Sequence, residues 1–211
     1  MQIDKDVHLV NTERMRLKKL SAKFWKEVES VEKLTDLLLI SVDDVSPYLE
    51  KIQHLQYLEK LKLAQVELDD RISKMVLPST LVELHLSSII CTDWSKMPSA
   101  PQVRDFVHKR MPLDSLLHIY PKLTGVNMIK LNTNGDDELD SVHKALPEIT
   151  GMEVLELEVF DGSEDKLVAM FEYICGREIK MILSYSGDVN EEKMMTLISP
   201  YSSCVSISAD T

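Results

Sequence analysis

Leu58-Glu-Lys-Leu61-Lys-Leu63 is the clearest copy of a pattern that returns along the chain: apolar, two variable, apolar, variable, apolar. Further copies begin at Leu34, Leu81, Leu123 and Met152, and shorter ones are Met181-Ile-Leu183 and Val205-Ser-Ile207. Neighbouring copies start 24 residues apart between Leu34 and Leu58, and 23 residues apart between Leu58 and Leu81. Internal repeats with periods of about 20–50 residues indicate a chain built from stacked structural units.

Each copy predicts one β-strand. Side chains alternate along a strand, so Leu61 and Leu63, two residues apart, point to the same side. One such strand cannot bury that side alone, but copies stacked side by side, with a helical return after each, build one continuous core. A proline stands a few residues before three copies, at Pro78, Pro121 and Pro147, where it would end the preceding helix. We therefore expect an α/β fold with a curved parallel sheet of about seven strands and helical returns.

This pattern resembles the leucine-rich-repeat superfamily, whose units are about 20–29 residues long. The resemblance covers roughly residues 34–211 and is to irregular members, which are ribonuclease-inhibitor-like or associated with an F-box. It implies a leucine-rich-repeat solenoid over residues 34–211 that recognises other proteins as a scaffold or adaptor, without catalysis.

Residues 1–33 differ from the repeats. Between Met1 and Lys26 there are seven basic and three acidic residues. Apolar residues recur at helical spacing, at Leu17, Leu20, Phe24, Val28 and Val31, which predicts a helix that caps the first repeat. Alternatively, this helix docks an acidic partner. The stretch is similar to the last helix of an F-box, although the Leu-Pro opening is missing, so an alternative function is the substrate-recognition subunit of an SCF-type ubiquitin ligase.

One step in the repeat is too long. Leu81 and Leu123 begin copies 42 residues apart, which predicts an insertion at about residues 90–122. Insertions in repeat proteins form loops, and loops often carry function, so Trp94 and Phe106 in this segment are candidates for partner contact. The alternative is that the insertion only fills space on the convex side.

Composition excludes several classes of function. The net charge of −11 disfavours nucleic acid, because binding phosphates requires clustered Lys and Arg. No run reaches the roughly 18 apolar residues of a membrane span, and the N-terminus lacks a signal-peptide core. Three widely separated cysteines, Cys91, Cys175 and Cys204, suit a reducing compartment and do not form a zinc site. We expect a cytoplasmic or nuclear protein.

No pattern in the chain indicates catalysis. An enzyme on a doubly wound sheet would also alternate strands and helices, but no glycine-rich phosphate turn follows any predicted strand. The segment Asn132–Asp137 resembles a calcium loop until Gly135 is aligned with the loop glycine, which places Lys130 at the first ligand. We predict no catalytic residue, no cofactor and no metal ligand.

The candidate partner surface consists of variable positions that flank the buried residues of each strand. These positions are Asp36, Leu38, Ile40, Lys60, Lys62, Glu83, His85, Asn127, Glu156 and Glu158. Leu38 and Ile40 are large and apolar, so either the N-terminal cap buries them or they anchor a partner.

Acidic residues also recur just after the strands and could form a rim that attracts a basic partner. They occur at Asp43-Asp44, Asp69-Asp70, Asp93, Asp136-Asp137-Glu138, Asp161 with Glu164-Asp165, and Asp188 with Glu191-Glu192. The alternative is that these carboxylates only satisfy the N-termini of the return helices.

Overall fold

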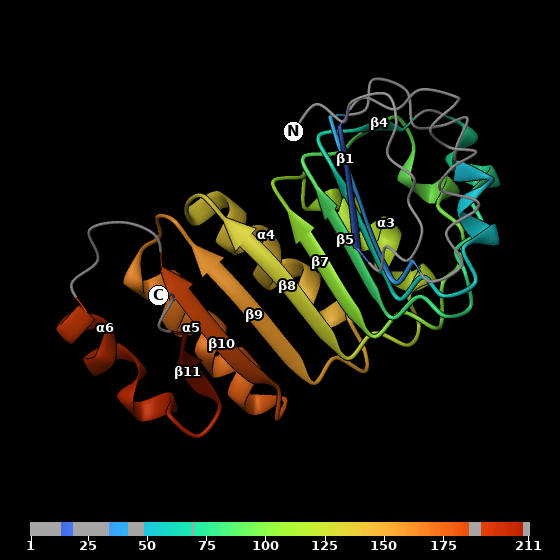
Figure 1. Cartoon of the computed structure of the whole chain (residues 1–211). Helices are drawn as coiled ribbons and strands as arrows, with labels where there is room; N and C mark the ends of the chain where they lie inside the picture. The colour runs from blue at the N-terminus through green and yellow to red at the C-terminus, as the bar shows by residue number, and fades with distance from the viewer. Residues whose placement is uncertain (1–13, 19–33, 42–48, 69, 186–190, 209–211) are drawn as a thin grey trace.

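In the computed structural model, residues 14–18, 34–41, 49–68, 70–185 and 191–208 are described. They contain one parallel sheet of nine strands, whose spatial order is their order along the chain (Figure 1). The strands are β1 (Arg14–Lys18), β2 (Asp36–Ile40), β3 (Lys60–Ala64), β5 (Glu83–Ser87), β7 (Asp105–Lys109), β8 (Met128–Thr133), β9 (Val154–Val159), β10 (Lys180–Tyr185) and β11 (Val205–Ile207). The predicted α/β class with a parallel sheet is confirmed. The sheet has nine strands, where about seven were expected.

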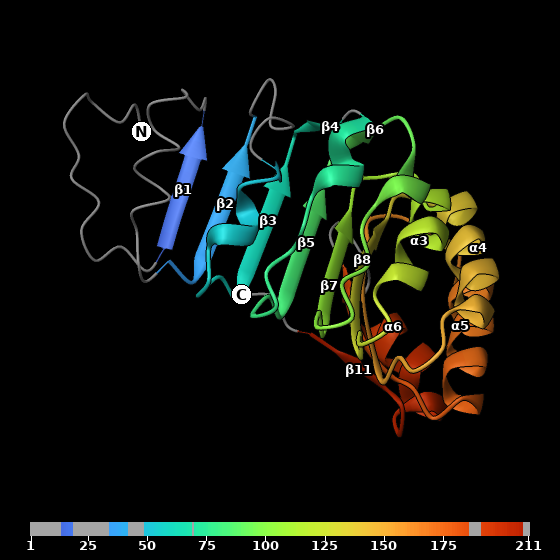
Figure 2. The same cartoon turned by 90° about the vertical axis from the view of Figure 1, so that its right-hand side faces the viewer.

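The return segments change character along the chain. Early returns contain the 3-10 helices η1 (Ile52–His54), η2 (Asp70–Lys74) and η3 (Trp94–Lys96), together with a second parallel sheet of β4 (Glu67–Leu68) and β6 (Ile90–Cys91). Later returns contain the α-helices α3 (Asp114–Ile119), α4 (Asp136–Ala145), α5 (Glu164–Gly176) and α6 (Glu191–Ile198), and the 3-10 helices η4 (Tyr120–Lys122), η5 (Leu146–Glu148) and η6 (Ser199–Tyr201). Figure 2 shows the return helices along one side of the strands.

The core lies between the sheet and its returns. Buried and partly exposed residues alternate along β2, β3 and β5, as the pattern predicts. The strand register aligns the buried residues in two rows: Leu37, Leu61, Leu84, Phe106, Ile129, Leu155 and Met181, and beside it Leu39, Leu63, Leu86, His108, Leu131, Leu157 and Leu183. Burying each apolar side chain contributes about 1.5–3 kcal/mol, so the two rows supply much of the stability.

A repeated turn ends each early strand. The residue after the strand has a positive φ of 50–53° at Ser41, Gln65, Ser88 and Arg110. The N–H groups of the first three donate to the last carbonyl of the next strand, at 3.0, 2.9 and 3.0 Å. At Arg110 the pattern changes, and its N–H donates to the side-chain Oδ1 of Asn132 at 2.7 Å. From β8 to β10 each strand has six residues instead of five.

The predicted insertion at residues 90–122 is wrong. This segment contains β7, and its first residue Asp105 pairs with Glu83, 22 residues earlier, and with Met128, 23 residues later. The true copies of the motif are Val103-Arg-Asp-Phe106-Val-His108 and Val126-Asn-Met-Ile129-Lys-Leu131. Phenylalanine and histidine replace leucine in the first, and the second starts three residues after Leu123. The long step is therefore two ordinary units.

The predicted N-terminal helix is also wrong where the structure describes it. Leu17 lies in β1, which pairs in parallel with β2 from Arg14 opposite Asp36 to Lys18 opposite Ile40. Of the predicted apolar stripe, β1 contains Leu17, which lies two residues after Met15, a spacing that fits the period of a strand. The remaining positions of the expected helix, from Leu20 to Val31, lie outside the described residues.

Two of the three cysteines form a disulfide, which the sequence analysis did not anticipate. Cys175 lies in the last turn of α5, and Cys204 directly precedes β11. The stacking of units brings them together although they are 29 residues apart. Cys91 takes no part in this disulfide.

Candidate interaction surface

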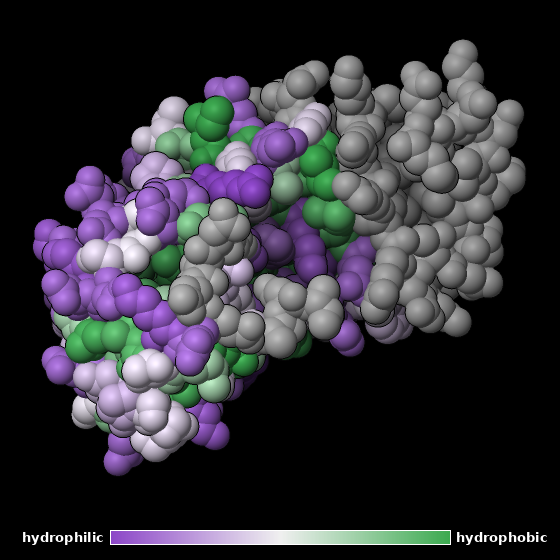
Figure 3. All heavy atoms as spheres, turned by 90° about the vertical axis from the view of Figure 1, so that its left-hand side faces the viewer, coloured by the Kyte–Doolittle hydropathy of each residue, from purple (hydrophilic) through white to green (hydrophobic). Residues whose placement is uncertain are grey.

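The side of the sheet opposite the buried rows carries a second set of aligned side chains, which we call the inner face. Alternation along each strand places them there. The register groups them by position along the strands: first Asp36, Lys60, Glu83, Asp105, Met128, Val154 and Lys180, then Leu38, Lys62, His85, Val107, Lys130, Glu156 and Ile182, and last Ile40, Ala64, Ser87, Lys109, Asn132, Glu158 and Ser184. In the space-filling view, the molecule is hollowed in the middle, and hydrophilic and hydrophobic residues adjoin there (Figure 3).

Glu83 joins two lysines at the N-terminal part of the inner face. Its carboxylate lies 3.1 Å from Lys60 Nζ and 3.4 Å from Lys62 Nζ. Burial alone would raise the pKa of Glu83, but the hydrogen bond from Lys60 and the charge of Lys62 hold it below its ordinary value. The carboxylate of Glu83 therefore stays ionised at neutral pH between the two lysine side chains.

His85 occupies the middle of the inner face. Partial burial and the nearby ammonium groups of Lys62 and Lys109 lower the pKa of His85 to about 4, although the carboxylate of Glu83 opposes them. The imidazole is therefore neutral at pH 7. A neutral ring can both donate and accept a hydrogen bond, which suits a polar group of a partner.

Two further ion pairs cross the C-terminal part of the inner face. Lys109 Nζ on β7 donates to Glu158 Oε2 on β9 at 2.8 Å, passing over β8. Lys130 and Glu156 pair between the neighbouring strands β8 and β9. From β2 to β10, the inner face carries five carboxylates and five lysines: Asp36, Glu83, Asp105, Glu156 and Glu158, with Lys60, Lys62, Lys109, Lys130 and Lys180. Over these seven strands it is balanced in charge, although the chain carries −11.

Nine of the predicted partner residues lie together on the inner face and are partly exposed: Asp36, Leu38, Ile40, Lys60, Lys62, Glu83, His85, Glu156 and Glu158. The partial exposure of Leu38 and Ile40 means that the described structure does not bury these two side chains completely.

Three predicted partner residues are not on this surface. Phe106 and Trp94 are only 0% and 9% exposed, so both belong to the core instead of a projecting loop. Asn127 is exposed but precedes β8, because the expected register of that copy was three residues too early. Its carbonyl accepts the N–H groups of Glu153 and Val154, as the equivalent carbonyl does in earlier units.

Sequence reasoning missed the residues that β7 and β8 place on the inner face. These are Asp105, Val107, Lys109, Met128, Lys130 and Asn132. A search for the repeat motif that accepted any large residue at its second apolar position, here Phe106, and any residue at its third, here His108, would have found the unit that begins at Val103.

Several acidic residues after the strands are used within the fold. Asp93 accepts a hydrogen bond from the Ser95 N–H at 3.0 Å at the start of η3. Asp136, at the start of α4, accepts from the Ser163 N–H at 2.6 Å and so links two return segments. These contacts fit the explanation that the carboxylates satisfy the ends of helices. Asp43, Asp44, Asp69 and Asp188 lie outside the described residues.

A histidine and a serine also meet in the core. His108 Nε2 lies 2.7 Å from Ser115 Oγ, which donates to the carbonyl of Pro112 at 2.6 Å. Because the serine has one proton to donate, Nε2 carries the proton of this contact. His108 is only 2% exposed, and burial lowers its pKa to about 4. A substrate cannot reach this pair, so its role is structural.

The described residues lack the features of two other kinds of site. They contain no group of three or more His, Cys, Asp or Glu that could hold a metal ion. In the same part of the chain, no helix combines the length and apolar character that crossing a bilayer requires. No protein-family model matches the chain, and no curated protein sequence matches it.

Proposed function

We propose that this protein is a non-enzymatic interaction module of the leucine-rich-repeat type, in which the inner face binds a protein partner. The spacing of the units supports the repeat assignment, since paired strand positions lie 22–26 residues apart from Arg14 to Val205. Such solenoids use an extended sheet surface for recognition.

The observation that carries the proposal is the composition of the inner face. Partly exposed apolar residues at Leu38, Ile40 and Ile182 lie among lysines and carboxylates. Apolar anchors surrounded by charged groups are a common arrangement at protein interfaces. Because every anchor stands on a strand within the sheet, little ordering is needed on binding, which favours affinity.

The test replaces the apolar end of the inner face and leaves the core unchanged. The full-length protein, the double variant Leu38→Glu with Ile40→Lys, and a control are immobilised in turn and exposed to native extract. Captured proteins are identified by mass spectrometry, and one is purified for titration. We expect the partner bound by the unchanged protein to be lost with the double variant.

The control introduces the same two charged residues, Glu and Lys, on the return helices, as Leu117→Glu with Met195→Lys. Both side chains are exposed, on α3 and α6. This control should bind as the unchanged protein does. Equal binding by both double variants, with unchanged circular dichroism melts, would place the interaction elsewhere. The alternative role in a ubiquitin ligase depends on residues 1–33, whose described part is strand β1.

A further inference from the structure

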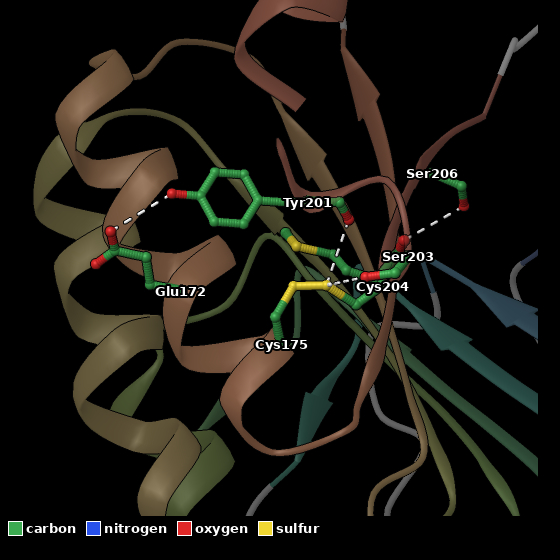
Figure 4. The surroundings of a disulfide bond; sticks show 7 residues. Glu172, Cys175, Tyr201, Ser203, Cys204 and Ser206 are labelled. Atoms are coloured by element: carbon green, nitrogen blue, oxygen red, sulfur yellow. Dashed lines mark hydrogen bonds between the residues drawn. A yellow bond between two sulfur atoms is a disulfide. The ribbon is translucent and has the colours of Figure 1, made fainter. Parts of the chain in front are cut away.

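The disulfide joins two consecutive units near the C-terminal edge of the sheet. Figure 4 shows Cys175 on a helix and Cys204 on the segment beside it, with Tyr201 and Glu172 nearby. The Cα atoms of the two cysteines are 5.5 Å apart, within the range of about 4.4–6.8 Å that suits a disulfide. The loop that it closes contains β10 and α6.

Few other interactions attach β11 to the sheet. It pairs with β10 at three positions, whereas β10 pairs with β9 at six. The Met181 N–H donates to the Cys204 carbonyl at 2.7 Å, and the Ser208 N–H donates to the Leu183 carbonyl at 2.9 Å. Val205 is the buried side chain of this short strand, and Ile207 is partly buried against the core. Ser206 Oγ also donates to the Met181 carbonyl at 3.3 Å. Because these contacts are few, the disulfide adds to the attachment of β11.

Both cysteines are partly exposed, and the adjacent residues Gly176 and Ser203 are exposed. Structural disulfides that resist reduction are commonly shielded, whereas exposed ones exchange with thiols more readily. This exposure contrasts with the completely buried leucines of the two core rows.

We propose that the bond between Cys175 and Cys204 is a reversible redox switch, which low-molecular-mass thiols open and which controls how firmly β11 is held against β10. This inference goes beyond the proposed function and does not depend on it. In the oxidised protein the bond keeps Cys204, and with it the start of β11, beside the end of α5. In the reduced protein the short ladder, the packing of Val205 and Ile207, and the hydrogen bond of Ser206 hold the strand.

The chemistry is ordinary thiol–disulfide exchange. A thiolate of the glutathione class attacks one sulfur, the sulfur–sulfur bond breaks, and the released cysteine thiolate takes a proton. A second thiolate attacks the mixed disulfide, so the second cysteine is released and the small-molecule disulfide leaves. Two electrons pass from two thiols to the protein, which gains two protons.

The test compares the full-length protein equilibrated with oxidised or reduced glutathione. Intact mass and thiol counting establish the redox state, and hydrogen exchange is followed by mass spectrometry. On reduction, we expect the amide protection of β11 and of the facing edge of β10 to fall by roughly 100-fold, because the loop constraint is lost. Amides of β8 that exchange by local opening, three strands away, should keep their protection.

Two variants make the result specific to this bond. Cys204→Ser should exchange like the reduced protein in both buffers, and the matched control Cys91→Ser should behave like the unchanged protein. Failure of the two cysteines to pair in the oxidising buffer would overturn the proposal. So would equal protection of β11 in proteins whose oxidised and reduced states had been verified.

Discussion

The histidine in the leucine row offers the sharpest test of the core. His108 stands between Leu86 and Leu131 in register, and burial lowers its pKa to about 4 from an ordinary value near 6.5. Because the folded state disfavours the proton, the unfolded chain binds more protons between these two pH values. Stability that is present above about pH 6.5 is therefore lost as the pH falls towards 4.

The size of this loss follows from the two pKa values. Between pH 7.5 and pH 5, protonation of His108 in the unfolded state should lower the free energy of unfolding by about 2 kcal/mol. His108→Leu removes this term and continues the leucine row. The side chain of Ser115 keeps its hydrogen bond to Pro112, so the substitution leaves no unpaired donor there.

Urea unfolding followed by circular dichroism, at pH 7.5 and at pH 5, measures the difference. We expect His108→Leu to gain about 2 kcal/mol relative to the unchanged protein as the pH is lowered. The control is His118→Gln, which replaces an exposed histidine on α3 and should retain the original pH dependence. Parallel pH profiles for the unchanged protein and His108→Leu would refute the argument that His108 is buried and neutral.

Three further outcomes test other parts of the fold. Leu84→Asp should unfold the chain at room temperature, because this 0% exposed position offers the new charge no partner. A cooperative melt of this variant would refute the assignment of Leu84 to the core row. Asn132→Ala should lower the free energy of unfolding by about 1–2 kcal/mol, because the Arg110 N–H loses its acceptor. The control Asn132→Asp retains an acceptor. Equal urea midpoints for the two variants would refute the role of the Asn132 side chain as this acceptor. Cys175→Ser should reduce stability by about 3–4 kcal/mol in oxidising buffer and have little effect with a reductant present, whereas identical losses in both buffers would point to packing instead of the bond.

The local pattern determined the strands and the two sides of the sheet. In β3, alternation is sufficient to place Leu61 and Leu63 in the core and Lys60 and Lys62 on the inner face. This prediction needs no knowledge of neighbouring strands, because the side-chain period of two is a property of an extended backbone. The same reasoning located Glu83 and His85, and at the other end Glu156 and Glu158.

The tertiary structure decided what the local pattern left ambiguous. Phe106 and His108 do not resemble leucines in sequence, yet β7 is held in place by pairing with β5 and β8. Leu17 fits both a helix and a strand, and pairing with β2 decides for the strand. In each case the neighbour supplies hydrogen bonds that the segment cannot make alone.

Contacts between distant units also required the structure. Lys109 and Glu158 are 49 residues apart, and Cys175 and Cys204 are 29 residues apart. Their proximity depends on the summed lengths of the units between them. The register predicted for the copy at Leu123 was three residues too early, so Asn127 was expected within a strand, whereas it precedes β8. The alternation of side chains has a period of two residues and can be recognised within a single strand. The register between strands depends on the length of every unit that separates them, and it is fixed only when the sheet forms.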